Sequence, residues 1–174
     1  GCDVPLPEKI KAIRIAASQT WHATAWLIHR QDEFNLDTSA IFLGGSSAGA
    51  ETVLHAPFWD RQRMQLYGSK LHSSFTYAGV IAGAGAIMDL NLITRENQIP
   101  LMMMHGDADQ LVPYGTAAHH YCPPDSPGWL MLFGSHSIAR HIKDLNGTCY
   151  LTTFQGGGHQ YAGAHIQRNQ QPMV

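Results

Sequence analysis

The sequence predicts an α/β fold with a mostly parallel sheet and helices on both of its faces. Short apolar runs alternate along the chain with stretches whose apolar residues recur at helical spacing, as in successive βαβ units. The short runs are apolar throughout, which is typical of strands buried on both faces. The chain has 174 residues, of which 44% are hydrophobic and 14% charged, and this suffices for one ordered domain.

The first half of the chain contains a helix, a strand and a second helix. Apolar residues at helical spacing predict a long amphipathic helix over residues 7–30, and Pro7 suits its first turn. Residues 40–43 are a short apolar run before two glycines, which predicts a buried strand. A helix is expected over 47–56. Residues 57–74 follow as an irregular, partly helical excursion with many aromatic side chains.

The second half continues the alternation. Apolar runs predict buried strands at 77–82, 101–104 and 150–154. The segment 135–145 carries apolar residues on one helical face and is followed by an Asn-Gly pair that suits a helix end. No internal repeat, low-complexity tract or linker divides the sequence. We therefore expect a single domain over residues 1–174.

Charge and hydropathy exclude two classes of partner. Eleven Lys and Arg residues nearly balance 13 Asp and Glu residues, and no basic run occurs, so the chain has no electrostatic footprint for nucleic acid or an anionic membrane. No apolar stretch approaches the roughly 18 residues that span a bilayer. The first 11 residues lack the charged start and apolar centre of a signal peptide.

Cysteines and histidines do not form a metal-binding pattern. Cys2, Cys122 and Cys149 fit no ligand spacing, and both one disulfide with a free thiol and three reduced cysteines are open. The adjacent His119 and His120 lack the i, i+4 spacing and acidic partners of a zinc helix. We expect neither a metal nor a cofactor.

A nucleophile motif joins the first strand to the second helix. Gly45-Ser46-Ser47-Ala48-Gly49 matches G-x-S-x-G, in which a strained strand-to-helix turn presents the middle serine. Ser47 is preferred to Ser46 because only Ser47 has glycine at both flanking offsets. The helix N-terminus favours developing negative charge, and the backbone N–H of Ala48 is the expected oxyanion donor.

Candidates for the acid and the base follow two later strands. Asp107 and Asp109 both lie in the loop after the strand at 101–104, at the same sheet edge as Ser47, and either could instead stabilise an Asx turn. His159 follows three glycines after the strand at 150–154. It completes the order Ser, Asp, His, whereas the rival base His105 precedes the acid and should pack beneath it.

Three segments carry a resemblance to a known family. The sequence resembles a bacterial α/β-hydrolase carboxylesterase of the esterase/lipase and prolyl-oligopeptidase-like branch. The matching segments are Phe42-Leu43-Gly44-Gly45-Ser46-Ser47-Ala48-Gly49, His105-Gly106-x-x-Asp109-x-x-Val112-Pro113 and Gly158-His159. The resemblance implies the α/β-hydrolase fold and selects Asp109 over Asp107 as the acid. It also implies a cap-like role for the excursion at 57–74.

The resemblance also indicates what the sequence lacks. The family has about eight strands, and the four strands expected here correspond to the C-terminal half of its sheet. The H-G-G-G type loop that supplies a second oxyanion donor has no counterpart before Ser47. We expect a partial α/β-hydrolase domain that lacks an N-terminal segment or pairs with a partner chain.

The expected reaction is hydrolysis of a carboxylic ester through an acyl-enzyme. Short-chain or aromatic acyl esters are the expected substrates, either small molecules or acetyl or feruloyl groups on plant polysaccharide. One alternative is a serine peptidase of the prolyl-oligopeptidase type, although Ser46 and Ala48 differ from its usual G-W-S-Y-G. A non-catalytic truncated fold is the other alternative. Cytoplasm, periplasm and secretion all remain open.

Overall fold

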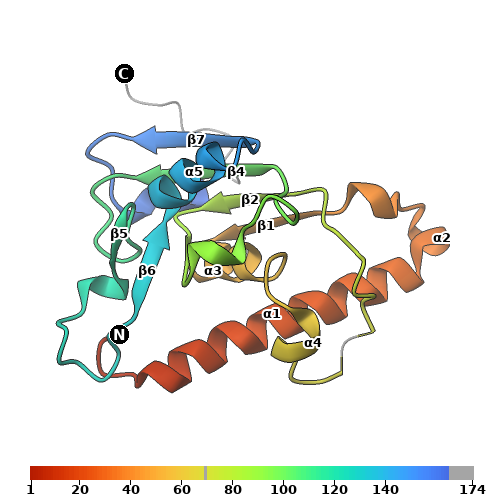
Figure 1. The fold of residues 1–174 in the computed structure, drawn as a ribbon, viewed down its shortest axis with the longest axis horizontal. Coiled ribbons are helices and arrows are strands. Elements are labelled where there is room, and N and C mark those ends of the chain that lie inside the picture. Colours follow the sequence, from red (N-terminus) through yellow and green to blue (C-terminus); the bar gives the residue numbers. More distant parts are fainter. Residues whose placement is uncertain (69, 165–174) are drawn as a thin grey trace.

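A computed structural model describes residues 1–68 and 70–164 of the chain (Figure 1). A four-stranded sheet with the order β1-β2-β4-β7 forms its centre, and every neighbouring pair is parallel. This confirms the α/β fold class and the mainly parallel sheet. The four strands are β1 (Phe42–Ser46), β2 (Gly79–Gly83), β4 (Leu101–Gly106) and β7 (Cys149–Phe154).

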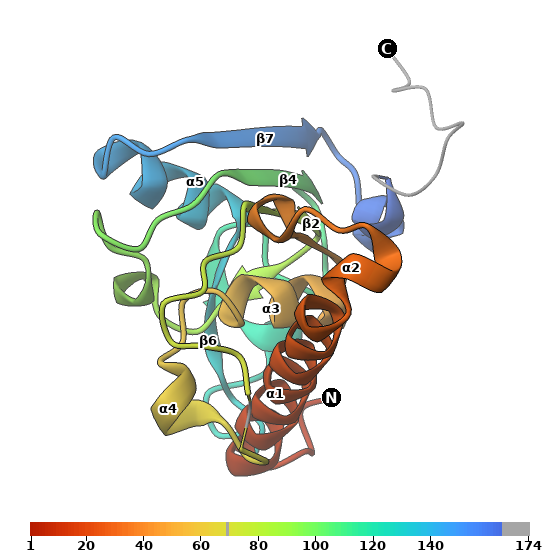
Figure 2. The same ribbon diagram turned by 90° about the vertical axis from the view of Figure 1, so that its right-hand side faces the viewer.

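Three long helices connect and support these strands. They are α1 (Leu6–His29), α3 (Ala48–His55) and α5 (Ser135–Asp144), each within two residues of its predicted bounds. In Figure 2, α3 and α1 lie side by side beneath the sheet. The shorter helices are α2 (Gln31–Phe34), α4 (Arg61–Met64) and the 3-10 turns η1 (Thr38–Ala40), η2 (Leu90–Leu92), η3 (His119–Tyr121) and η4 (His159–Gly163).

A second, small sheet was not predicted. It is antiparallel with the order β3-β6-β5, formed by β3 (Ala86–Ile87), β6 (Met131–Gly134) and β5 (Thr116–Ala118). Strands of two to four residues give no periodic signal, because a pattern of alternation needs more positions to be recognised. The connection between β5 and β6 carries η3, which lies near the candidate site.

The core lies on one face of the central sheet. Val80, Leu101 and Met103 point into it and are at most 2% exposed, and the buried faces of α1, α3 and α5 belong to the same cluster. The alternate strand residues point to the opposite face, where Met102 and Tyr150 are 41% and 63% exposed. The expected helical cover of this second face does not appear among residues 1–68 and 70–164.

The excursion at 57–74 lies at the end of α3 that is remote from Ser47. Its helix α4 packs near α1, and the Arg14 guanidinium donates to the carbonyl of Met64. Arg61 donates to the carbonyl oxygens of residues 72, 73 and 75, which closes the segment on itself. α3 carries the chain away from Ser47 before the excursion begins, and the cap-like role of this segment stays a prediction.

A disulfide ties the N-terminal segment to the β5–β6 connection. Cys2 and Cys122 are bonded across 120 positions of sequence, and Cys149 is a free, half-buried thiol. The first of the two alternatives left open by the sequence is thus the one observed. None of the described helices is long and apolar enough to cross a membrane.

Candidate active site

Ser47 stands at a strained turn between β1 and α3. Its φ and ψ are 55° and −125°, a conformation that is rare for a residue with a side chain. Two hydrogen bonds hold the turn: Ser47 N–H donates to the carbonyl of Gly83 at 2.8 Å, and Glu51 N–H donates to the carbonyl of Ser47 at 3.0 Å. The expected strand-to-helix turn is therefore present, with Ser46 as the last residue of the strand.

The two glycines of the motif have different roles. A Cβ on Gly45 would lie 2.2 Å from the carbonyl oxygen of Gly49, so no side chain fits there. A Cβ on Gly49 would meet no atom within 4 Å. Position 45 must be glycine because the strand-to-helix turn brings the backbone of Gly49 against it. Position 49 has room for a side chain.

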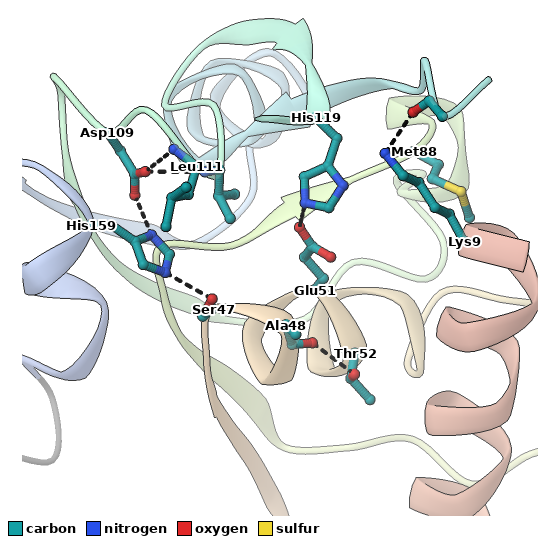
Figure 3. A network of polar contacts seen from close by, with 12 residues as sticks. Lys9, Ser47, Ala48, Glu51, Thr52, Met88, Asp109, Leu111, His119 and His159 are labelled. Carbon is teal, nitrogen blue, oxygen red and sulfur yellow. Dashed lines mark hydrogen bonds and ion pairs between the residues drawn. The ribbon is translucent and has the colours of Figure 1, made fainter. Parts of the chain in front are cut away.

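Hydrogen bonds join Ser47, His159 and Asp109 into one chain (Figure 3). The Ser47 hydroxyl lies 2.8 Å from His159 Nε2, and His159 Nδ1 lies 2.7 Å from Asp109 Oδ2. A carboxylate can only accept, so Nδ1–H donates to Asp109 and Nε2 is free to accept from the serine hydroxyl. The three side chains come from loops that follow β1, β4 and β7, at one edge of the parallel sheet.

Asp109 is fully buried and ionised. Its Oδ1 accepts from the backbone N–H groups of Leu111 and Val112 at 2.8 and 3.1 Å. Burial alone would raise the pKa of Asp109, but the hydrogen bonds from His105, Leu111, His159 and Val112 outweigh it. The net effect holds this pKa well below its usual range. Asp109 is therefore a carboxylate anion, and in that form it fixes the orientation of the His159 imidazole.

His105 packs against the acid and does not reach Ser47. Its Nε2 lies 3.3 Å from Asp109 Oδ2 and 3.2 Å from the carbonyl of Val112, both of which can only accept. Nε2 therefore carries a proton, and Nδ1 lies 2.8 Å from the hydroxyl oxygen of Ser135. His105 is fully buried, and this arrangement makes it a second support for the carboxylate.

Asp107 anchors the loop that carries His159. Its Oδ1 accepts from the backbone N–H of Gly156 at 2.7 Å, directly after β7. The loop also passes very close to the end of β4. A Cβ on Gly106 would lie 2.1 Å from the carbonyl oxygen of Gly157, so no side chain fits there. The sequence offers Asp107 as a rival acid or a turn residue, and nothing local in it indicates this contact with a residue 49 positions away.

Ala48 is the first residue of α3. Its N–H has no carbonyl within the helix to bond, and it points out of the helix N-terminus beside Ser47. Negative charge is favoured at such a position.

Aromatic residues around the excursion are largely core. Phe58, Trp59 and Tyr77 are at most 6% exposed and line a cavity of about 450 Å³ together with residues 96–99. These residues precede β2 and β4, so the cavity opens at the amino edge of the sheet, opposite the serine. Among residues 1–68 and 70–164, no cluster of three or more His, Cys, Asp or Glu side chains is arranged to hold a metal ion.

Fold and site together define an α/β-hydrolase fold with a hydrogen-bonded Ser-His-Asp chain at the carboxyl edge of its sheet. No family model and no curated protein matches the sequence. Solved structures of esterases share the fold at low sequence identity.

One such structure is a carboxylesterase from Lactobacillus plantarum WCFS1, with 18% identity and a TM-score of 0.62 over 91% of this chain and 59% of that one. Another is Thermogutta terrifontis esterase 2 phosphorylated by paraoxon, with 16% identity and a TM-score of 0.61 over 84% of this chain and 54% of that one. A third is a truncated carbohydrate esterase from gut microbiota, with 13% identity and a TM-score of 0.60 over 92% of this chain and 64% of that one. The present chain thus spans between 54% and 64% of the length of these three proteins.

Proposed function

We propose that the protein containing this chain is a serine carboxylic-ester hydrolase that works through an acyl-enzyme. The observation that carries the proposal is the continuous hydrogen-bonded chain from the Ser47 hydroxyl through His159 to the buried carboxylate of Asp109. The strained backbone of Ser47 supports it, because such strain concentrates at functional sites. The esterase neighbours are consistent with it at the level of the fold.

The reaction has two halves. In the first, His159 Nε2 takes the hydroxyl proton as Ser47 Oγ attacks the ester carbonyl, and the protonated imidazole then gives that proton to the leaving alcohol. In the second, His159 takes a proton from water as the water oxygen attacks the acyl-enzyme, and it returns that proton to Ser47 Oγ as the acyl–oxygen bond breaks and the acid leaves. Asp109 keeps Nδ1 protonated throughout and stabilises the imidazolium.

The N–H of Ala48 stabilises the oxyanion in both halves. The negative charge develops at the N-terminus of α3, where free backbone donors and the helix dipole favour it. Removing one such donor from a serine hydrolase costs about 3–4 kcal/mol of transition-state stabilisation.

The proposed substrates are short-chain or aromatic acyl esters, including acetyl or feruloyl groups on plant polysaccharide. One structural neighbour is described as a carbohydrate esterase, which supports the polysaccharide variant. The aromatic cavity at the amino edge lies at the opposite end of the sheet from Ser47, so it does not receive the acyl group. Selectivity must therefore come from residues close to the triad.

The test is hydrolysis of p-nitrophenyl acetate by the wild type and by Ser47→Ala, beside an aminoacyl p-nitroanilide as a peptidase substrate. We expect ester turnover that Ser47→Ala abolishes and no amide turnover. Ester turnover that persists in folded Ser47→Ala contradicts the nucleophile. Faster turnover of the amide than of the ester favours the peptidase alternative.

A further inference from the structure

A cavity of about 710 Å³ lies between α1 and the segment that leads from α4 to β2. Residues 22–29 of α1 contribute one wall, and Ala25, Ile28 and Leu71 line the cavity with apolar side chains. Sites for small molecules usually measure about 300–1,000 Å³ and are mostly apolar, so both the size and the lining suit a ligand. None of the roles proposed above uses this cavity.

The cavity lies far from the triad. Figure 1 shows the C-terminal end of α1 on the side of the molecule where the strands of the central sheet begin, and the strands end on the opposite side. Ser47, Asp109 and His159 follow the ends of β1, β4 and β7. No triad residue lines the cavity, which is therefore a separate site.

Two exposed aromatic rings belong to its walls. Trp26 is 49% exposed, and the Arg30 guanidinium lies over its ring, 4.2 Å from the centroid. Tyr67 is 59% exposed and stands edge-to-face with His22, with 6.3 Å between the ring centroids. Exposed aromatic rings in a concave surface offer apolar faces to a planar ligand.

The second wall is fastened to α1 at both of its ends. The N–H of Leu66 donates to the hydroxyl of Ser18, a fully buried residue of α1, at 3.2 Å. Phe75 packs edge-to-face on Tyr77, with 5.0 Å between the ring centroids, and the Tyr77 hydroxyl lies 2.9 Å from the hydroxyl of Thr24 in α1. The cavity is thus formed before any ligand arrives, which lowers the entropic cost of binding.

The polar groups around the cavity favour an acceptor over a donor. Lys70 is the one lysine or arginine among the described residues that line it, and none of these residues is Asp or Glu. The N–H of Ser74 donates to His72 Nδ1 at 3.3 Å, so the proton of the neutral imidazole lies on Nε2, which can donate. An ammonium group and an imidazole N–H fit the oxygens of an anion, which can only accept.

We propose that this cavity binds a monocarboxylic acid with an aromatic body, whose carboxylate pairs with Lys70 and whose ring lies against Trp26 and Tyr67. One ammonium group matches one negative charge, and the apolar lining offers no partners to a ligand that is polar throughout. The inference goes beyond the proposed esterase function and does not depend on it, because no residue of the Ser47 site takes part. Hydrolysis of an aromatic acyl ester releases an acid of this class.

The first test locates the bound acid by NMR of the indole N–H groups. The chain has four tryptophans, and Trp26→Phe assigns the signal of Trp26. We expect cinnamate to shift this signal in the wild type and equally in Ser47→Ala, and to leave the signal of Trp129 in place. Cinnamate at about 10 mM is sufficient to detect a millimolar Kd.

The second test compares the Kd of cinnamate with that of its neutral amide, cinnamamide. We expect Lys70→Gln to raise the Kd of cinnamate about fivefold and to leave that of cinnamamide within about twofold, because only cinnamate has the charge that Lys70 pairs. Trp26→Ala should weaken both about tenfold. Lys11→Gln is the matched control, since it removes a lysine of α1 that is 63% exposed and lies outside the cavity.

Each other result overturns a stated part of the inference. Cinnamate that leaves the Trp26 signal in place, or that no longer binds to Ser47→Ala, overturns the site. Equal affinities for cinnamate and cinnamamide overturn the role of Lys70, and octanoate that binds more tightly than cinnamate overturns the aromatic body. A protein that binds cinnamate at Trp26 but hydrolyses no ester supports this inference and contradicts only the proposed function.

Discussion

Replacing Asp109 by asparagine reverses the proton position on His159 while leaving the shape of the site unchanged. Asp109 Oδ1 accepts from the backbone N–H groups of Leu111 and Val112, so the amide oxygen of asparagine must keep that place. The amide NH2 then takes the place of Oδ2 and donates to His159 Nδ1, while His105 Nε2–H keeps the carbonyl of Val112 as its acceptor. Nε2 becomes protonated and donates to the Ser47 hydroxyl, so it can no longer accept the serine proton.

The expected loss of activity is large. In serine hydrolases an imidazole held in the wrong tautomer lowers kcat about 10⁴-fold. Because each tenfold change corresponds to 1.36 kcal/mol, four factors of ten amount to about 5.4 kcal/mol of transition-state stabilisation. Loss of the charge-assisted hydrogen bonds also lowers the free energy of unfolding by about 1–3 kcal/mol at neutral pH.

The stability difference has a defined pH dependence. Asp109 has a pKa held below its ordinary value, so its contribution is fully present above the unfolded-state pKa of about 3.9. The contribution is lost as the pH falls below that value toward the folded-state pKa. Unfolding free energies of the wild type and Asp109→Asn should therefore converge as the pH is lowered through this range.

The assay is the initial rate of p-nitrophenyl acetate hydrolysis, with a melting curve to establish that Asp109→Asn is folded. The matched control is Asp107→Asn, whose amide oxygen can still accept from Gly156 and whose kcat should stay within about threefold of the wild type. A folded Asp109→Asn protein with more than a tenth of wild-type kcat would refute the reasoning. Equal losses in the two variants would refute the assignment of the acid.

Three further predictions concern stability. Burial lowers the pKa of His55 from 6.5 to about 4, so the fold should lose about 3 kcal/mol of unfolding free energy between pH 6.5 and 4, and a flat urea-unfolding profile there would contradict this. Reducing the Cys2–Cys122 disulfide with dithiothreitol should lower the unfolding free energy by about 2–5 kcal/mol, and an unchanged melting temperature would show that the bond does not restrain the chain. Gly45→Ala should lose several degrees of melting temperature or fail to fold, whereas Gly49→Ala should fold normally; equal behaviour of the two would contradict the close approach at the elbow.

The central strands and the elbow could be predicted because their signals are local. Each strand of the parallel sheet is a short run of apolar residues, and each of the four begins within two residues of its expected first residue. The turn at Ser47 needs glycine at position 45, where the backbone of Gly49 approaches. That requirement appears within the five-residue motif Gly45-Ser46-Ser47-Ala48-Gly49, so it can be recognised from the local sequence. The order of Ser47, Asp109 and His159 along the chain then follows the order of the strands that carry them.

Features built from distant contacts could not be predicted. The Cys2–Cys122 bond spans 120 positions, and three cysteines allow several pairings. The contact of Glu51 with His119 joins a helix to a turn 68 positions later, and neither residue belongs to a motif. The excursion at 57–74 contacts α1 through Arg14 and Met64, which are 50 positions apart, and nothing local in the sequence indicates that contact.

The most direct measurement of the central claim is covalent modification by paraoxon, which phosphorylates one of the structural neighbours. Mass spectrometry of the digested protein should find one diethylphosphoryl group on the peptide that contains Ser47, with release of one equivalent of p-nitrophenol. The modification should be absent in Ser47→Ala and strongly slowed in His159→Ala. A group on Ser46 or on any other residue, or equal modification of Ser47→Ala, would contradict the claim that His159 and Asp109 activate the Ser47 hydroxyl.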